Sequence, residues 1–152
     1  MFLPPAPMTA QAIEKLNQAT GVYGLALTAA QAAMLAQRES ESLLRAGRMD
    51  FDGGILRELA LAFAASPHVF KDTWAEMLGE LIELFYAFKN ETHDRLSDEE
   101  LLHAMVRLFN GPAQGSLRAL ADCREETLLR FAAEDGFSPE RDEGEEDYDD
   151  TV

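Results

Sequence analysis

With 152 residues, the chain has the length of one domain, and its 47% content of hydrophobic residues is enough to build a core without disulfides. Its formal net charge of −15 repels phosphate backbones and anionic lipid surfaces, so we expect no direct binding to nucleic acid or to a membrane. A single cysteine, Cys123, excludes an intrachain disulfide framework and is typical of a reducing compartment, which predicts a cytoplasmic protein.

The two ends of the chain differ in composition from the part between them. Residues 1–8 contain three prolines and form a leader that lacks the basic region and the apolar run of a signal peptide. Residues 134–152 hold ten acidic residues against Arg141 alone, and such a segment cannot bury enough apolar surface to offset its ordering entropy. We therefore predict a helical domain over residues 9–135 and a disordered acidic tail over residues 136–152.

Apolar residues recur with the period of an α-helix along nearly the whole domain, and Gly or Pro interrupts the pattern at intervals. Thr28 and Gln31 have the spacing of a capping box at a helix start. Ser97 and Glu100 repeat that spacing. The sequence therefore predicts an all-α, single-domain bundle of five to six helices. The expected helices cover residues 9–20, 29–46, 54–65, 70–92, 97–110 and 116–134.

Two of these helices have distinctive faces. Small residues share one face of the 29–46 helix and predict the close approach of a second helix. Large apolar residues share a stripe on the 70–92 helix that is expected to face the core. The acidic residues Glu76, Glu80 and Glu83 lie on the opposite face, and we expect them to be hydrated. Recognition of this acidic face by a partner protein is the alternative. The small-residue face comprises Ala29, Ala33, Ala36, Ser40, Leu43 and Gly47, and the stripe comprises Trp74, Met77, Leu78, Leu81, Phe85 and Phe88.

The stretch DFDGG, residues 50–54, directly precedes the third predicted helix. It is not a calcium loop, because the obligatory glycine and the bidentate glutamate are missing from their positions. A phosphate cradle is an alternative, since Gly53 and Gly54 would expose amide groups at a helix N-terminus, but Asp50 and Asp52 would repel the anion. We favour a hinge, in which Asp52 caps the helix and the glycines allow a sharp turn.

Residues with catalytic or metal-binding chemistry are sparse. The sequence contains no Gly-x-Ser-x-Gly, Walker loop, dinucleotide fingerprint or His-Glu-x-x-His motif. Glu100 and His103 have the spacing of a carboxylate di-metal site, but a second such pair is missing and both are expected to face solvent. Cys123 is expected to be a half-buried structural thiol. We therefore expect no cofactor, no catalytic residue and no metal. The alternative is a small metal-binding or hydrolytic protein that uses Glu100, His103 and carboxylates of the 70–92 helix.

Three segments have the most individual sequences: RAGRMDFDGGIL at 45–56, FAASPHVF at 63–70 and LFYAFKNETHDRLSDEELLHAM at 84–105. Together they resemble a bacterial family of small all-helical proteins of unknown function, over about residues 20–110. The resemblance implies an all-helical bacterial domain, and it brings no activity, cofactor or catalytic residue to this chain.

Two motifs carry the resemblance. The first is an Arg-x-x-Phe-Gly-Gly-Gly-Ile turn, in which Asp52 replaces the first glycine of the family pattern. The second is Phe-Tyr-x-x-Lys-Asn-Glu, whose last three residues stand at a helix end where core packing does not explain them. We predict a non-enzymatic module that binds an unidentified protein partner, and a homodimer remains an alternative. The candidate functional surface comprises Arg48, Phe51, Gly53, Gly54, Lys89, Asn90 and Glu91.

Overall fold

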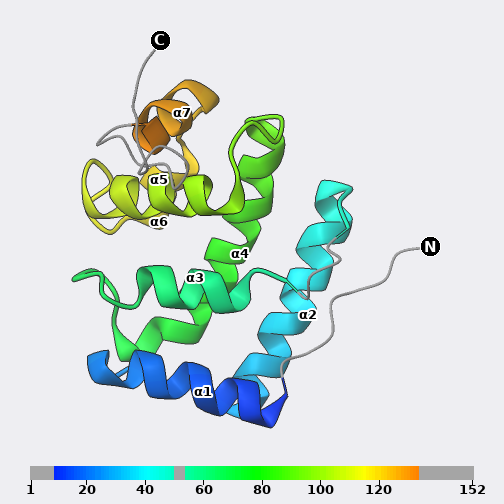
Figure 1. The fold of residues 1–152 in the computed structure, drawn as a ribbon, viewed down its shortest axis with the longest axis vertical. Helices are drawn as coiled ribbons and strands as arrows, with labels where there is room; N and C mark the ends of the chain where they lie inside the picture. The colour runs from blue at the N-terminus through cyan, green and yellow to red at the C-terminus, as the bar shows by residue number, and fades with distance from the viewer. Residues whose placement is uncertain (1–8, 50–53, 134–152) are drawn as a thin grey trace, which may run out of the picture.

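The computed structural model of the chain describes residues 9–49 and 54–133. Within these residues the fold contains helices and no strand (Figure 1), which confirms the all-α prediction. The predicted leader and acidic tail, and with them Phe51, Asp52 and Gly53, lie outside the described residues. The elements are α1 (Ala10–Thr20), η1 (Gly21–Tyr23), α2 (Ala29–Ala46), α3 (Leu56–Phe63), η2 (Lys71–Thr73), α4 (Trp74–Glu91), α5 (Asp98–Asn110), α6 (Leu117–Ala121) and α7 (Glu125–Ala133).

The two longest helices, α2 and α4, pack against each other over most of their lengths. In Figure 1, α1 lies toward one end of this pair, α5 to α7 lie toward the other, and α3 crosses between them. The apolar stripe predicted on α4 is buried at all six positions, from Trp74 to Phe88. As expected for a central helix, α3 has Leu59, Ala60 and Phe63 fully buried. One core therefore joins the described helices.

The helix predicted over 116–134 is wrong, because two shorter helices, α6 and α7, replace it. The chain turns at Asp122, whose N–H bonds the carbonyls of Arg118 and Ala119, and the Cys123 N–H bonds the carbonyl of Leu120 at 3.1 Å. This tight turn ends α6 and lets α7 leave in a new direction. Leu120 and Leu128, both fully buried, can then reach the core from different sides. A single straight helix could not place both of them there.

The small-residue face predicted for α2 is also wrong. Of the predicted face only Leu43 is buried, whereas Ala29 and Ala33 are exposed, and the buried face is rotated toward Leu35 and Glu39. Burying Leu35 together with Leu43 removes more apolar surface from water than burying alanines beside Leu43, so the helix turns toward Leu35. The same rotation carries a glutamate into the interior.

The buried Glu39 carboxylate joins α2, α3 and α4. Its side chain is at the centre of the fold, with the residue only 3% exposed. Its Oε2 accepts a hydrogen bond from the Ile55 N–H at the start of α3 and another, at 2.8 Å, from the Tyr86 hydroxyl on α4. Gly54 leaves room for the carboxylate, because a Cβ at this position would overlap it, and its φ of 102° suits glycine alone.

This contact changes the interpretation of the glycine turn. The position before α3 is occupied by Ile55, which offers no side-chain cap, while a carboxylate from another helix bonds its N–H. A side-chain oxygen of Glu39 thus already occupies the place at which a phosphate cradle would hold its ligand. The positive φ of Gly54 fits the sharp turn of the predicted hinge, whereas the N-cap position of α3 is Ile55 and not the predicted Asp52.

We predict that Glu39→Ala lowers the free energy of unfolding by about 3 kcal/mol, because it leaves the Ile55 N–H and the Tyr86 hydroxyl without this acceptor and opens a cavity. Urea unfolding, followed through the fluorescence of the buried Trp74, measures the loss.

Glu41→Ala is the matched control, since this glutamate lies on the exposed face of the same helix. We expect it to change stability by less than about 0.5 kcal/mol. An equal loss of unfolding free energy in Glu39→Ala and Glu41→Ala would show that the Glu39 contact does not hold α2, α3 and α4 together.

Candidate functional site

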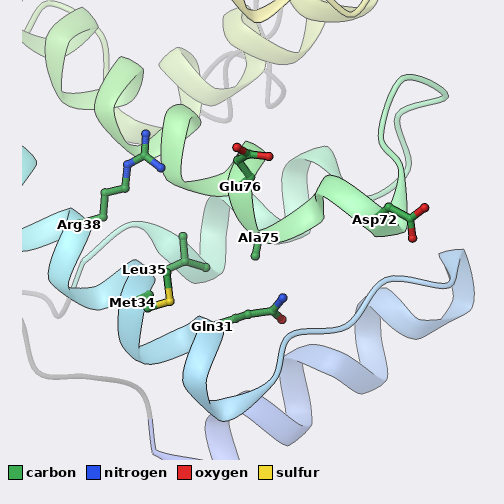
Figure 2. A pocket seen from close by; sticks show the side chains of 7 residues that line it. All are labelled: Gln31, Met34, Leu35, Arg38, Asp72, Ala75 and Glu76. Carbon is green, nitrogen blue, oxygen red and sulfur yellow. The ribbon is translucent and has the colours of Figure 1, made fainter.

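A groove runs between α2 and α4, and its first part lies toward the start of both helices. This part, here called the Met34 lobe, has a volume of about 490 Å³. The Met34 side chain is exposed beside the buried Leu35, and Ala75 lies opposite on α4. Figure 2 shows the lining residues, which are Gln31, Met34, Leu35, Arg38, Asp72, Ala75 and Glu76.

The second part of the groove, here called the Ser42 lobe, lies toward the ends of the same helices. Its volume is about 500 Å³. Its lining residues follow those of the Met34 lobe at helical spacing on both helices, so the two lobes share one face of the molecule. From Gln31 to Ala46 the groove extends roughly 22 Å along α2. The Ser42 lobe is lined by Ser42, Arg45, Ala46, Glu83, Leu84, Ala87 and Asn90.

An ion pair separates the two lobes. Arg38 reaches from α2 to α4 (Figure 2), where its Nε lies 2.8 Å from Glu83 Oε2. The guanidinium passes over Gly79, at which a Cβ would lie 2.5 Å from Arg38 Nη1. The absence of a side chain at Gly79 therefore gives Arg38 its path. The prediction that Glu83 is simply hydrated is wrong, because α2 supplies it with a cation.

A polar clasp closes the far end of the groove, formed by Arg48, Asn90 and Asp94. One guanidinium nitrogen of Arg48 donates to Asn90 Oδ1 at 2.7 Å, and the other donates to Asp94 Oδ1 at 2.6 Å. The Asn90 amide in turn donates to the carbonyl of Ala46 at the end of α2, at 2.9 Å. The clasp thus ties the ends of α2 and α4 together.

The other two candidate residues at the end of α4 have structural partners as well. The buried Lys89 ammonium donates to the carbonyl of Leu96 and pairs with Asp98 at the start of α5, both at 2.9 Å. Glu91 accepts a hydrogen bond at 3.4 Å from the Glu125 N–H, which begins α7. Together with the bond from Asn90 to α2, these contacts place the Lys-Asn-Glu motif at the junction of α4 with α2, α5 and α7.

The structure therefore brings together four of the seven residues of the candidate surface: Arg48, Lys89, Asn90 and Glu91. Gly54 lies instead beside Glu39, and Phe51 and Gly53 are outside the described residues. Of the clustered residues, Asn90 also lines the Ser42 lobe. It is the point at which the predicted surface and the groove meet.

The electrostatics of the clasp are dominated by Arg48. Its hydrogen bond to Asp94 is the main cause that holds the pKa of that carboxyl below its ordinary value. Asp94 also has a left-handed backbone, with φ of 58°, at the turn between α4 and α5. Because the carboxylate form is favoured in the folded state, Asp94 stabilises the fold above the ordinary pKa of an aspartate.

The Glu100 and His103 side chains, which the sequence predicted to face solvent, are partly buried. Glu100 and His103 are both half-buried, and Glu100 Oε1 accepts the Ser97 N–H at 2.9 Å in the capping box predicted for α5. Among residues 9–49 and 54–133, no three His, Cys, Asp or Glu side chains are grouped so as to hold a metal ion. Cys123 is half-buried, as expected, and burial raises the pKa of its thiol.

Sequence reasoning missed the residues that shape the groove. Arg38 and Ser42 lie on the side of α2 away from the predicted small-residue face, and Glu83, the partner of Arg38, lies on a distant segment. One signal was present, since Gly79 in the middle of a strongly predicted helix is unfavourable unless something approaches its backbone. That signal alone does not name Arg38 as the residue that approaches.

Comparison with known proteins identifies the family. The chain matches the Family of unknown function (DUF6323) over residues 12–135, and it belongs to this family. No curated protein and no solved structure matches it. In the part of the chain that the structure describes, no helix combines the length and apolarity needed to cross a membrane.

We predict that Arg48→Ala raises the pKa of the Asp94 carboxyl toward the ordinary value of about 3.9. NMR titration of the side-chain carboxyl carbon measures this pKa directly. The reason is the loss of the main hydrogen bond that favours the charged form.

Linkage gives the direction of the effect on stability. The wild type is expected to be more stable than Asp94→Asn at pH values above the ordinary pKa of an aspartate. This stability difference is expected to disappear as the pH falls through the lower pKa of Asp94 in the folded state. Arg45→Ala removes a neighbouring exposed arginine and is expected to leave the Asp94 titration unchanged. An unshifted titration in Arg48→Ala would contradict the clasp.

Proposed function

We propose that this protein is a non-enzymatic, cytoplasmic interaction module that holds a helical segment of a partner protein in the α2–α4 groove. The observation that carries this proposal is the groove itself, whose two lobes lie on one face and extend over about the length of a short helix. Grooves between two helices commonly receive the apolar face of an amphipathic helix.

The side chains of the Met34 lobe support this function. Met34 is 69% exposed although it is apolar, and it stands beside the buried Leu35. An unbranched methionine adapts its shape to different apolar partners, which suits a binding surface. Ala75 keeps the opposite wall low, so an inserted side chain can approach the backbone of α4.

The rigid frame around the groove supports it as well. The Glu39 contact fixes α2 against α4 from the core side, and the clasp fixes the ends of the same helices. Helices held in this way present a preformed surface, which lowers the entropic cost of binding. The net charge of −15 also keeps the chain apart from anionic surfaces and favours cationic partners.

We predict that a displayed library of helical peptides, selected on the wild-type protein, yields binders whose affinity falls at least about tenfold in Met34→Glu. A buried carboxylate in this lobe would be desolvated by an apolar anchor, so binding would weaken. Titration calorimetry measures the affinities, and amide shifts in NMR spectra locate the peptides.

Leu61→Glu is the matched control, because Leu61 is an exposed apolar residue on α3 and does not line either lobe. It is expected to retain full affinity. A library without binders, or binders that Met34→Glu leaves unaffected, would disprove the groove as the binding site.

A further inference from the structure

The two lobes differ in the charge that they offer. Asp72 and Glu76 are exposed at the Met34 lobe, and neither forms an ion pair with another residue of 9–49 or 54–133. The one cation of this lobe, Arg38, is paired with Glu83. The Met34 lobe therefore has an uncompensated negative charge that favours a cationic ligand group.

The Ser42 lobe instead offers an uncompensated positive charge. Glu83 is paired with Arg38, whereas Arg45 is exposed and has no acidic partner within the described residues. The Ser42 hydroxyl is buried in the same lobe, with the residue 3% exposed, and makes no hydrogen bond to any part of the described chain. Buried hydroxyls are nearly always paired, so an orphaned one in a lobe points to a polar group supplied from outside. An arginine beside a hydroxyl suits a carboxylate or an amide.

The spacing of the lobes limits the shape of the occupant. From Leu35 in the first lobe to Ala46 in the second is eleven positions along α2, or roughly 16 Å. A second helix lying along the groove returns to the same face after about eleven residues. Between the lobes it must pass the Arg38–Glu83 pair, which joins α2 to α4 across the groove, so a small side chain suits the midpoint.

From these three features we infer that the partner segment is a bipolar amphipathic helix of a protein. Its apolar anchors lie about eleven residues apart with a small residue between them. Lysine or arginine at one end faces Asp72 and Glu76, and an acidic or amide side chain at the other end faces Ser42 and Arg45. This inference rests on the proposed function and adds the chemistry of the partner. A second copy of the chain is a poorer occupant, because two surfaces with net negative charge repel.

Four synthetic helical peptides of about 18 residues test the inference, all with the same leucine anchors and central alanine. Two are bipolar, with lysines at either the first or the last turn and glutamates at the other. One has lysines at both ends, and one has glutamates at both ends. Two bipolar versions are needed because the direction of the helix in the groove decides which of them matches. Affinities are measured by calorimetry near physiological ionic strength, where long-range attraction is screened.

We expect one bipolar peptide to bind the wild type at least about tenfold more tightly than the peptide with glutamates at both ends, and more tightly than the one with lysines at both ends. Arg45→Glu should transfer the preference to the peptide with lysines at both ends. Asp72→Lys combined with Glu76→Lys should transfer it to the peptide with glutamates at both ends. Glu14→Lys, a charge change on α1, should leave the order unchanged.

The outcomes separate this inference from the proposed function. Four peptides that bind the groove with equal affinity, and that the charge variants do not reorder, would overturn the bipolar partner while leaving the groove as a binding site. Peptides that bind elsewhere or not at all would overturn both. Sedimentation analysis adds a third result, since a dimer that Met34→Glu dissociates would make a second copy the occupant and contradict the inference.

Discussion

The fold depends on a carboxylate placed where apolar side chains would be expected. Glu39 lies inside the junction of α2, α3 and α4, where it accepts hydrogen bonds from the start of one helix and from the Tyr86 hydroxyl of another. A buried carboxylate is tolerated only when such donors surround it, so its presence fixes the distances between the three helices. Gly54 is the necessary complement, because any side chain there would displace the carboxylate.

The α2–α4 pair acquires its outward shape from the same arrangement. With Glu39 turned to the core, the neighbouring Arg38 is directed over α4, where Gly79 leaves room for it and Glu83 holds it. The ion pair divides an apolar groove into two lobes of opposite charge character, with the clasp at its far end. One face of α2 thus organises the core, while the adjacent face forms a surface with the features of a binding site.

The residues on which the sequence resemblance was based have structural roles in this fold. Lys89, Asn90 and Glu91 connect α4 with the ends of α2, α5 and α7, and Arg48 completes the connection. Such residues maintain the relative positions of the helices that line the groove. Their contacts give each of these residues a structural role at the ends of the helices.

The sequence by itself determined the helical class, the positions of α1, α2 and α5 and the buried stripe of α4, because apolar period, capping boxes and glycine stops are local signals. It did not determine which face of α2 is buried, the break at Asp122, or the partners of Glu39 and Arg38. The buried face of α2 and the partners of Glu39 and Arg38 depend on contacts between segments far apart in the sequence, such as Arg38 with Glu83 and Glu39 with Tyr86. The break at Asp122 lets both Leu120 and Leu128 reach the core. Only the tertiary structure decides such pairs, since burial energy and hydrogen bonding act on the packed helices rather than on one helix alone.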